Sequence, residues 1–161
     1  MTPPVFWVDD VPRAGETALV SGPEGRHAVT VTRLRPGEPV ILGDGRGTRA
    51  DCTVTEVSGK DRLTVRAGRV EFVARRTPLV TIVQALPKAE RSELAVDLMT
   101  EAGADVIVPW QAARSIARWS GAKAAKGVEK WRTTAATAAK QARRAWIPEV
   151  HDLSATIDVR D

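Results

Sequence analysis

The stretch LVTIVQALPKAERSELAVDLMTEAGADVIVP, residues 79–109, decides the fold class of the second half of the chain. It begins with the nearly continuous apolar run 79–85, which is typical of a strand buried on both faces of a parallel sheet. Apolar residues then recur at helical spacing over 88–102, and Gly103 is well placed to close that helix. A second apolar run covers 106–109. Strand, helix and strand within about thirty residues predict a right-handed crossover and a parallel sheet.

Outward from this unit, a second helix is predicted over 122–145. The residues of its apolar face are mostly small, so its packing partner must approach closely: Val128, Trp131, Ala135, Ala138, Ala139 and Ala142. The segment 147–150 resembles the entry to another strand. Because an open parallel sheet needs more than two or three strands, this half of the chain looks unfinished.

The first half is rich in β-branched residues and in turn signals. Its expected strands are 5–8, 39–42, 52–57 and 63–66. Asp44-Gly45 between two apolar runs predicts a hairpin, and a short helix is expected to begin near Ser21 or Gly22. Together these elements predict a small β-barrel of roughly 70 residues, with the boundary between the halves inside 71–78.

Length and composition bound the protein class. The chain has 161 residues, which allows one domain or two small ones. Its single cysteine, Cys52, excludes an intrachain disulfide framework and a cysteine-rich zinc site. With two histidines, His27 and His151, a histidine-based metal cluster is not expected either. Apolar runs too short for a bilayer and no visible signal peptide predict a soluble protein of the reducing cytoplasm, with no membrane partner and no metal.

The charge is unevenly distributed. Residues 112–150 carry nine Lys and Arg against two Glu, a net charge of +7, whereas the rest of the chain carries −3. Such a local excess suits a polyanion. A solvated helical face is the alternative, and the near absence of compensating acids argues against it.

Eight cations are the predicted RNA-binding residues. Arg33 and Arg35 precede a Pro-Gly turn, where they are either surface residues or contacts to an RNA backbone. Others follow the expected parallel strands, and ligands of open α/β sheets bind beyond the carboxyl ends of strands. The full set is Arg33, Arg35, Lys88, Arg91, Arg114, Arg118, Arg143 and Arg144. Trp110 and Trp119 flank part of this set and either stack on bases or pack in a core.

Other motifs carry no predicted chemistry. The glycines at 43, 45 and 47 precede no helix, so they indicate a hairpin turn and not a dinucleotide loop. His27 is expected to pack or cap, and Cys52 is expected to be a buried, inert thiol. No catalytic residue is assignable.

Several segments resemble one family when they are taken together. They are 82–88, 100–105, 107–109 with Arg114-Ser115, Lys130-Trp131, Gln141, Arg144 and 147–150, preceded by Arg26-His27 and 31–38. At this spacing they resemble the RsmE family, the ribosomal RNA small subunit methyltransferases E. Lys140, where the family often has an acid, and Ala142, where it has a small polar residue or a thiol, depart from the pattern.

The resemblance implies a PUA-like RNA-binding β-barrel at 1–73 and the first part of an α/β SPOUT methyltransferase domain at 74–161. It implies a homodimeric enzyme that uses S-adenosylmethionine to methylate N3 of a uridine in 16S rRNA of the small ribosomal subunit. In that family the cofactor lies in a C-terminal knot, so the cofactor site is expected beyond Asp161. We therefore expect an N-terminal fragment that binds RNA weakly, without cofactor and without methylating it.

Two other functions remain open at this point. One is a non-catalytic, RNA-binding or ribosome-associated protein, and the other is an assembly module whose interface is the alanine-rich face. For the methyltransferase, attack by N3 of uracil requires loss of its imide proton. Nearby cations would stabilise the resulting negative charge, although arginine itself cannot serve as the base.

Overall fold

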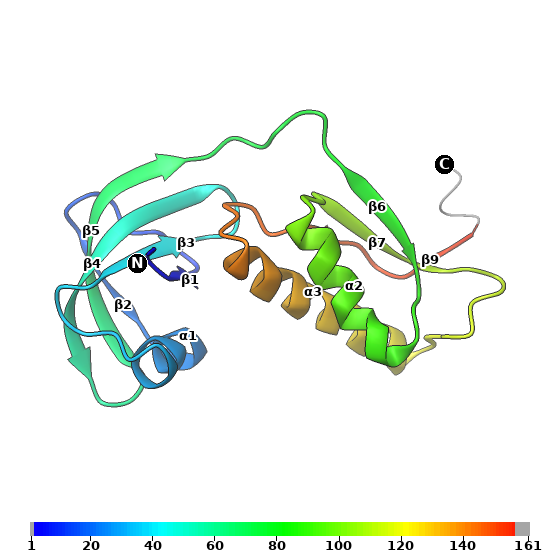
Figure 1. Cartoon of the computed structure of the whole chain (residues 1–161), viewed down its shortest axis with the longest axis horizontal. Coiled ribbons are helices and arrows are strands. Elements are labelled where there is room, and N and C mark those ends of the chain that lie inside the picture. The colour runs from blue at the N-terminus through cyan, green and yellow to red at the C-terminus, as the bar shows by residue number, and fades with distance from the viewer. Residues whose placement is uncertain (1, 157–161) are drawn as a thin grey trace. The chain divides into compact units, whose positions relative to one another are not determined.

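The computed structural model describes residues 2–156 (Figure 1). The chain divides between Ala74 and Arg75 into two compact units. The first is mainly β-structure, and the second is α/β.

Five strands form the sheet of the first unit. They are β1 (Val5–Trp7), β2 (Thr17–Val20), β3 (Pro39–Gly43), β4 (Thr48–Ser58) and β5 (Arg62–Phe72). The strand order is β1-β3-β4-β5-β2, in which β1 pairs with β3 in parallel and the other pairs are antiparallel. The predicted strands are thus present, and β2 is an additional one. In the hydrogen-bonded ladder β1 and β2 are the two edges, so the pairing is that of an open sheet.

The predicted hairpin at Asp44-Gly45 is confirmed: it joins the antiparallel pair β3 and β4. The Asp44 carboxylate accepts hydrogen bonds from the backbone N–H groups of Arg46 and Thr48, at 2.7 and 3.0 Å. Inward-facing residues of β4, such as Cys52 and Val54, alternate with exposed ones and line the core of this unit.

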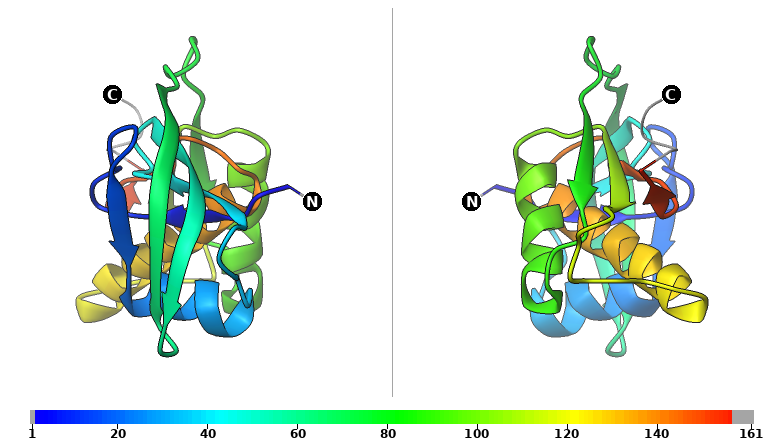
Figure 2. Two further views of the ribbon diagram at one scale, coloured as in Figure 1. Left: turned by 90° about the vertical axis from the view of Figure 1, so that its left-hand side faces the viewer. Right: turned by 90° about the vertical axis from the view of Figure 1, so that its right-hand side faces the viewer.

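The short helix predicted near Ser21 is also present. Ser21 is the N-cap of α1 (Gly22–Arg26), which continues into the π-helical turn η1 (His27–Val31). In Figure 2, left, α1 lies beside the turn between β4 and β5. A side chain on Gly25 would collide there with the backbone oxygens of Asp61 and Val20, so a glycine is required for this approach.

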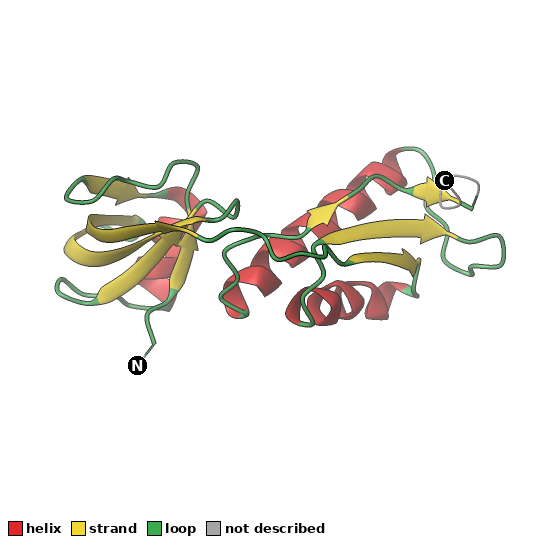
Figure 3. Ribbon diagram, turned by 90° about the horizontal axis from the view of Figure 1, so that it is seen from above, coloured by secondary structure: helices red, strands yellow, loops and turns green. Residues whose placement is uncertain are grey.

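The second unit alternates strands and helices. Its elements are β6 (Thr81–Ala85), α2 (Ala89–Glu101), β7 (Val106–Gln111), α3 (Ala122–Gln141), β8 (Glu149–Val150) and β9 (Ser154–Ala155). All strand pairs are parallel in the order β6-β7-β8, and β9 pairs with β7 further along the strand. Figure 3 shows these strands in yellow and the helices in red. The predicted strand–helix–strand unit and its parallel sheet are confirmed.

One face of this sheet holds the core. Ile82, Ile107 and Val150 pack with residues of both α2 and α3. Val83, which points to the opposite face, is 41% exposed. The expectation that β6 is buried on both faces is therefore wrong for the described residues, because α2 and α3 share the same core.

Helix α3 ends at Gln141, four residues before its predicted end. Arg143 has φ 55°, and the backbone N–H groups of Arg143 and Arg144 donate to the carbonyls of Lys140 and Ala139. This pair of bonds is a Schellman motif, which closes a helix with one left-handed residue. Ala142, expected on the buried face, is consequently exposed, whereas the other five residues predicted for that face are buried.

Candidate RNA-binding site

The carboxyl ends of β6 and β7 lie at the same edge of the sheet, since the two strands are parallel and in register from Thr81↔Val106 to Ala85↔Trp110. Lys88, the N-cap of α2, and Arg91 in its first turn follow β6. Arg114 and Arg118 lie in the loop 112–121 that follows β7. All four side chains are exposed. The structure thus places four of the eight predicted RNA-binding residues at one edge.

The loop 112–121 is held in shape by its own hydrogen bonds. The Arg118 guanidinium donates to the Ala113 carbonyl at 2.8 Å, and the Trp119 backbone N–H donates to Gln111 Oε1 at 2.7 Å. Some of the Arg118 hydrogen-bond donors are therefore used within the loop. Arg114 has no such bond within residues 2–156, so its full set of donors is available to a ligand.

Helices α2 and α3 begin at this same edge and are tied together near it. Lys130 Nζ lies 2.6 Å from Glu93 Oε1, and the Trp131 indole donates to Ser92 Oγ at 2.7 Å. The N-termini of two helices, of 13 and 20 residues, therefore add positive potential to the same edge. Lys123 and Lys126, in the first turns of α3, are exposed there as well. We did not predict them individually, although the basic composition of 112–150 includes them.

The two tryptophans differ in their surroundings. Trp119 packs edge-to-face against Trp131, with ring centroids 5.5 Å apart, and lies against Gly127. Trp119 was predicted either to stack on bases or to pack in a core, and in the structure it packs in the core. Trp110 is half-buried and donates from Nε1 to Thr156 Oγ1 at 3.2 Å.

Arg143 and Arg144 lie at the opposite edge of the sheet, because α3 runs back to the start of β8. Arg144 Nη1 donates to the carbonyls of Thr100 and Ala104 at 2.9 and 2.6 Å, and Nη2 lies 3.5 Å from Asp105 Oδ1. Burial lowers the pKa of Arg144, and the Asp105 carboxylate opposes that shift. Its guanidinium is thus engaged by the protein, which differs from the phosphate contact expected for it. Arg143 is exposed.

Arg33 and Arg35 lie in the first unit and are both exposed. Arg33 follows the end of η1 with φ 58°, the left-handed region that side chains other than glycine seldom occupy. The Arg35 backbone N–H donates to Glu38 Oε2 at 2.7 Å, which fixes the turn that follows. Both side chains therefore project from ordered backbone.

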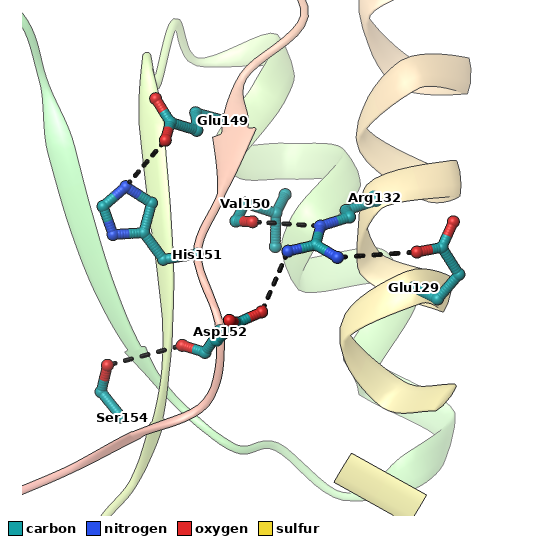
Figure 4. Close-up of polar contacts among 7 residues, drawn as sticks. All are labelled: Glu129, Arg132, Glu149, Val150, His151, Asp152 and Ser154. Atoms are coloured by element: carbon teal, nitrogen blue, oxygen red, sulfur yellow. Dashed lines mark hydrogen bonds and ion pairs between the residues drawn. The ribbon is translucent and has the colours of Figure 1, made fainter. Parts of the chain in front are cut away.

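Arg132 is a structural residue that we did not single out from the sequence. Figure 4 shows its guanidinium between α3 and the segment after β8. It donates to the Val150 carbonyl at 3.2 Å and to Asp152 Oδ1 at 3.0 Å, and it lies 3.6 Å from Glu129. Arg132 and Lys130 therefore serve the fold, and the basic segment is not uniformly available to a ligand.

Cys52 and His27, for which we predicted no chemistry, both pack against other residues. Cys52 is buried, and burial raises the pKa of its thiol to about 11. The His27 ring packs edge-to-face against Phe6, with centroids 5.9 Å apart. Within residues 2–156, no three His, Cys, Asp or Glu side chains gather so as to hold a metal ion, and no helix is long and apolar enough to cross a membrane.

The charge at the carboxyl edge also bears on a cofactor. The cations gathered there favour phosphate and disfavour the positively charged sulfonium of S-adenosylmethionine. These residues do not fit that group, so none of them is assigned to it.

Comparisons with known proteins relate both halves of the chain to RNA methyltransferases. A family model described as the RNA methyltransferase domain matches residues 75–160, and one described as the RNA methyltransferase PUA domain matches residues 20–67. Ribosomal RNA small subunit methyltransferase E of Mycobacterium bovis is 51% identical over 94% of this chain, and that of Bacillus subtilis is 34% identical over 85%. The chain spans 58% and 54% of the lengths of these two proteins.

Solved structures show the same likeness. Ribosomal RNA small subunit methyltransferase E from Neisseria gonorrhoeae, bound to S-adenosyl methionine, superposes with a TM-score of 0.87 at 25% identity. That match covers 99% of this chain and 66% of the other. A putative methyltransferase from Legionella pneumophila with bound cofactor matches with a TM-score of 0.83 at 26% identity, over 96% of this chain and 64% of the other. With its PUA-like unit, its α/β unit and these relatives, the chain belongs to the RsmE family of RNA methyltransferases.

Proposed function

We propose that this chain binds 16S rRNA and serves in S-adenosylmethionine-dependent methylation of N3 of a uridine. RNA binding is assigned to the chain itself, and methyl transfer to a protein that contains it. We also propose that this enzyme is a cytoplasmic homodimer and that it acts on the small subunit during ribosome biogenesis.

One observation carries the proposal. Two parallel strands end at one edge of the sheet, and two helices begin there. Four cations follow the strand ends in this chain of an RNA methyltransferase family: Lys88, Arg91, Arg114 and Arg118. Guanidinium and ammonium groups on an open edge pair with the phosphates of RNA and position it without reading its sequence. In the PUA-like unit, Arg33 and Arg35 are proposed to contact the same RNA.

The same cations suit the chemistry at uracil. Loss of the N3 proton spreads negative charge over O2 and O4, and positive groups beside these oxygens lower the cost of that charge. Since arginine does not deprotonate, Arg91, Arg114 and Arg118 bind and stabilise but take no proton. The methyl group is proposed to come from S-adenosylmethionine, held by residues other than those of the carboxyl edge.

Deletion of the gene that encodes this chain tests the methylation. We expect one N3-methyluridine to be lost from 16S rRNA, as measured by mass spectrometry of nucleosides, and to return with a plasmid copy of the gene. An unchanged N3-methyluridine level would overturn the proposal for uridine N3.

RNA binding by the 161-residue chain is tested separately, by fluorescence anisotropy with a single-stranded 16S rRNA fragment over a series of salt concentrations. For Lys88→Ala combined with Arg114→Ala, we expect the slope of log K against log salt to fall by about 1.4, as for two lost phosphate contacts. The control combines Lys130→Ala with Arg69→Ala, which removes the same charge from residues that already pair with Glu93 and Glu71. Equal slopes in both double variants would contradict a role for the carboxyl edge.

A further inference from the structure

Helices α2 and α3 end in the same motif but with different residues at its left-handed position. In α2 that position is Gly103, with φ 103°, and the N–H groups of Gly103 and Ala104 donate to the carbonyls of Thr100 and Met99. In α3 the equivalent position is Arg143, with φ 55°. Glycine adopts this conformation without steric cost, whereas a residue with a Cβ is strained there.

Packing does not explain why an arginine occupies this position. Arg143 is exposed, and its backbone makes the bonds that a glycine would make equally well. A side chain kept at a strained position without a packing role is a candidate for a functional one. The guanidinium of Arg143 is the feature that glycine would lack.

Two further arginines lie near Arg144, the neighbour of Arg143. The Arg75 guanidinium carbon lies 4.4 Å from the centre of the Trp146 ring, over its face. Arg76, the next residue, is exposed. The positive charges of Arg76 and Arg75 add to burial in lowering the pKa of Arg144, which agrees with their proximity.

Nearby carboxylates are already used by other groups. Asp105 faces Arg144 and accepts from the Val80 backbone N–H at 2.9 Å, and Glu149 lies 3.2 Å from His151 Nε2. Within residues 2–156, Arg75, Arg76 and Arg143 form no ion pair. Three guanidinium groups therefore share this edge without a protein anion to neutralise them.

We propose that Arg75, Arg76 and Arg143 form a second RNA-binding surface, at the amino-terminal edge of the β6-β7-β8 sheet, which takes the sugar–phosphate backbone. Arg144 fixes the end of α3 from which Arg143 projects. The contact with the Trp146 ring orients the Arg75 guanidinium, whose N–H groups can still donate to a phosphate. A guanidinium can donate two parallel hydrogen bonds to two oxygens of one phosphate.

This surface rests on the proposed RNA binding but is separate from the carboxyl edge. It adds RNA contacts by residues that do not follow the carboxyl ends of β6 and β7. Backbone contacts here would orient the RNA and carry no sequence information.

Salt-dependent anisotropy with the same single-stranded 16S rRNA fragment tests the surface in the 161-residue chain. For Arg76→Ala combined with Arg143→Ala we expect the salt slope to fall by about 1.4. Arg76→Lys combined with Arg143→Lys should keep the slope, since a lysine still neutralises a phosphate. The charge-matched control is again Lys130→Ala with Arg69→Ala, which should leave the slope close to that of the unmodified chain.

The outcomes separate this surface from the proposed function. If the unmodified chain binds RNA and the Arg76/Arg143 alanine variant has an unchanged slope, the second surface is wrong while RNA binding stands. An equal fall in the control variant would also overturn it, because net charge alone would then explain the effect. If the unmodified chain binds no RNA even at low salt, both proposals fail. Circular dichroism of each variant verifies the fold before binding is compared.

Discussion

The Arg144 guanidinium and the Asp105 carboxylate join the end of α3 to the start of β7, with Nη2 and Oδ1 3.5 Å apart. Both side chains are largely buried, at 17% and 14% exposed. Arg144 also binds the carbonyls of Thr100 and Ala104, and Asp105 binds the Val80 N–H. The pair thus connects the ends of both helices with the beginnings of β6 and β7.

Replacing Arg144 by alanine should destabilise the second unit. The change leaves two carbonyls and a carboxylate without their donor, and such losses cost about 2–4 kcal/mol. Urea unfolding followed by tryptophan fluorescence measures it, since four of the five tryptophans lie in this unit. Arg143→Ala, one residue away and exposed, is the control and should stay within about 0.5 kcal/mol. Equal stability of the two variants would contradict the structural role of Arg144.

Arg143→Gly should separate stability from binding. Glycine relieves the left-handed strain at φ 55°, so we expect a gain of about 0.5–1 kcal/mol in the free energy of unfolding. The same change removes a guanidinium from the proposed second surface, so the RNA salt slope should fall by about 0.7. A variant that is more stable but binds RNA with the original slope would show that Arg143 does not contact phosphate.

Most elements of the fold could be predicted because local patterns specify them. The apolar run at β6, the helical spacing of α2 and the Gly103 stop reflect periodicity and backbone freedom, which act within a few residues. Strand β2 was missed because Thr17–Val20 is short, and pairing with β5 over four residues holds it in the sheet. The end of α3 was misplaced because an arginine, and not a glycine, takes the left-handed position.

The candidate site depends on residues that are distant in the sequence, so only part of it could be predicted. The rule that ligands bind beyond the carboxyl ends of parallel strands predicts the placement of Lys88, Arg91 and Arg114. Arg118, predicted from the basic segment, lies in the same loop as Arg114. The partners of Arg144 could not be predicted, since Thr100, Ala104 and Asp105 are about forty residues away along the chain. Likewise, composition does not show which cations of 112–150 are used by the fold; that depends on where Glu93 and Asp152 lie.

Stability should fall with alkaline pH through Cys52. Burial raises the pKa of the thiol from its ordinary 9.0 to about 11, so between these values the folded chain keeps a proton that the unfolded chain has lost. Stability is therefore fully present below pH 9 and declines up to about pH 11, by about 1–2 kcal/mol at pH 10.5. Urea unfolding of the chain and of Cys52→Ala at pH 8 and 10.5 isolates the thiol from other alkaline groups. The same pH dependence in both proteins would exclude this assignment.

Gly127→Ala should destabilise α3 although alanine is the better helix former. A Cβ at this position would lie 2.8 Å from three ring atoms of Trp119, which is itself packed against Trp131. Overpacking costs about 1–3 kcal/mol, which exceeds the gain of about 1 kcal/mol in helix propensity. The expected result in urea unfolding is a net loss of stability with an altered tryptophan emission.

The matched experiment places Gly127→Ala in a Trp119→Ala background, where no ring is left to collide. There the helix-propensity term stands alone, so the substitution should become stabilising by about 0.5–1 kcal/mol. A change of sign between the two backgrounds is a coupling between residues in contact, and it assigns the close approach of Gly127 to the Trp119 ring. Destabilisation of equal size in both backgrounds would instead locate the strain elsewhere in α3, and Trp119 would not be the residue that requires a glycine at position 127.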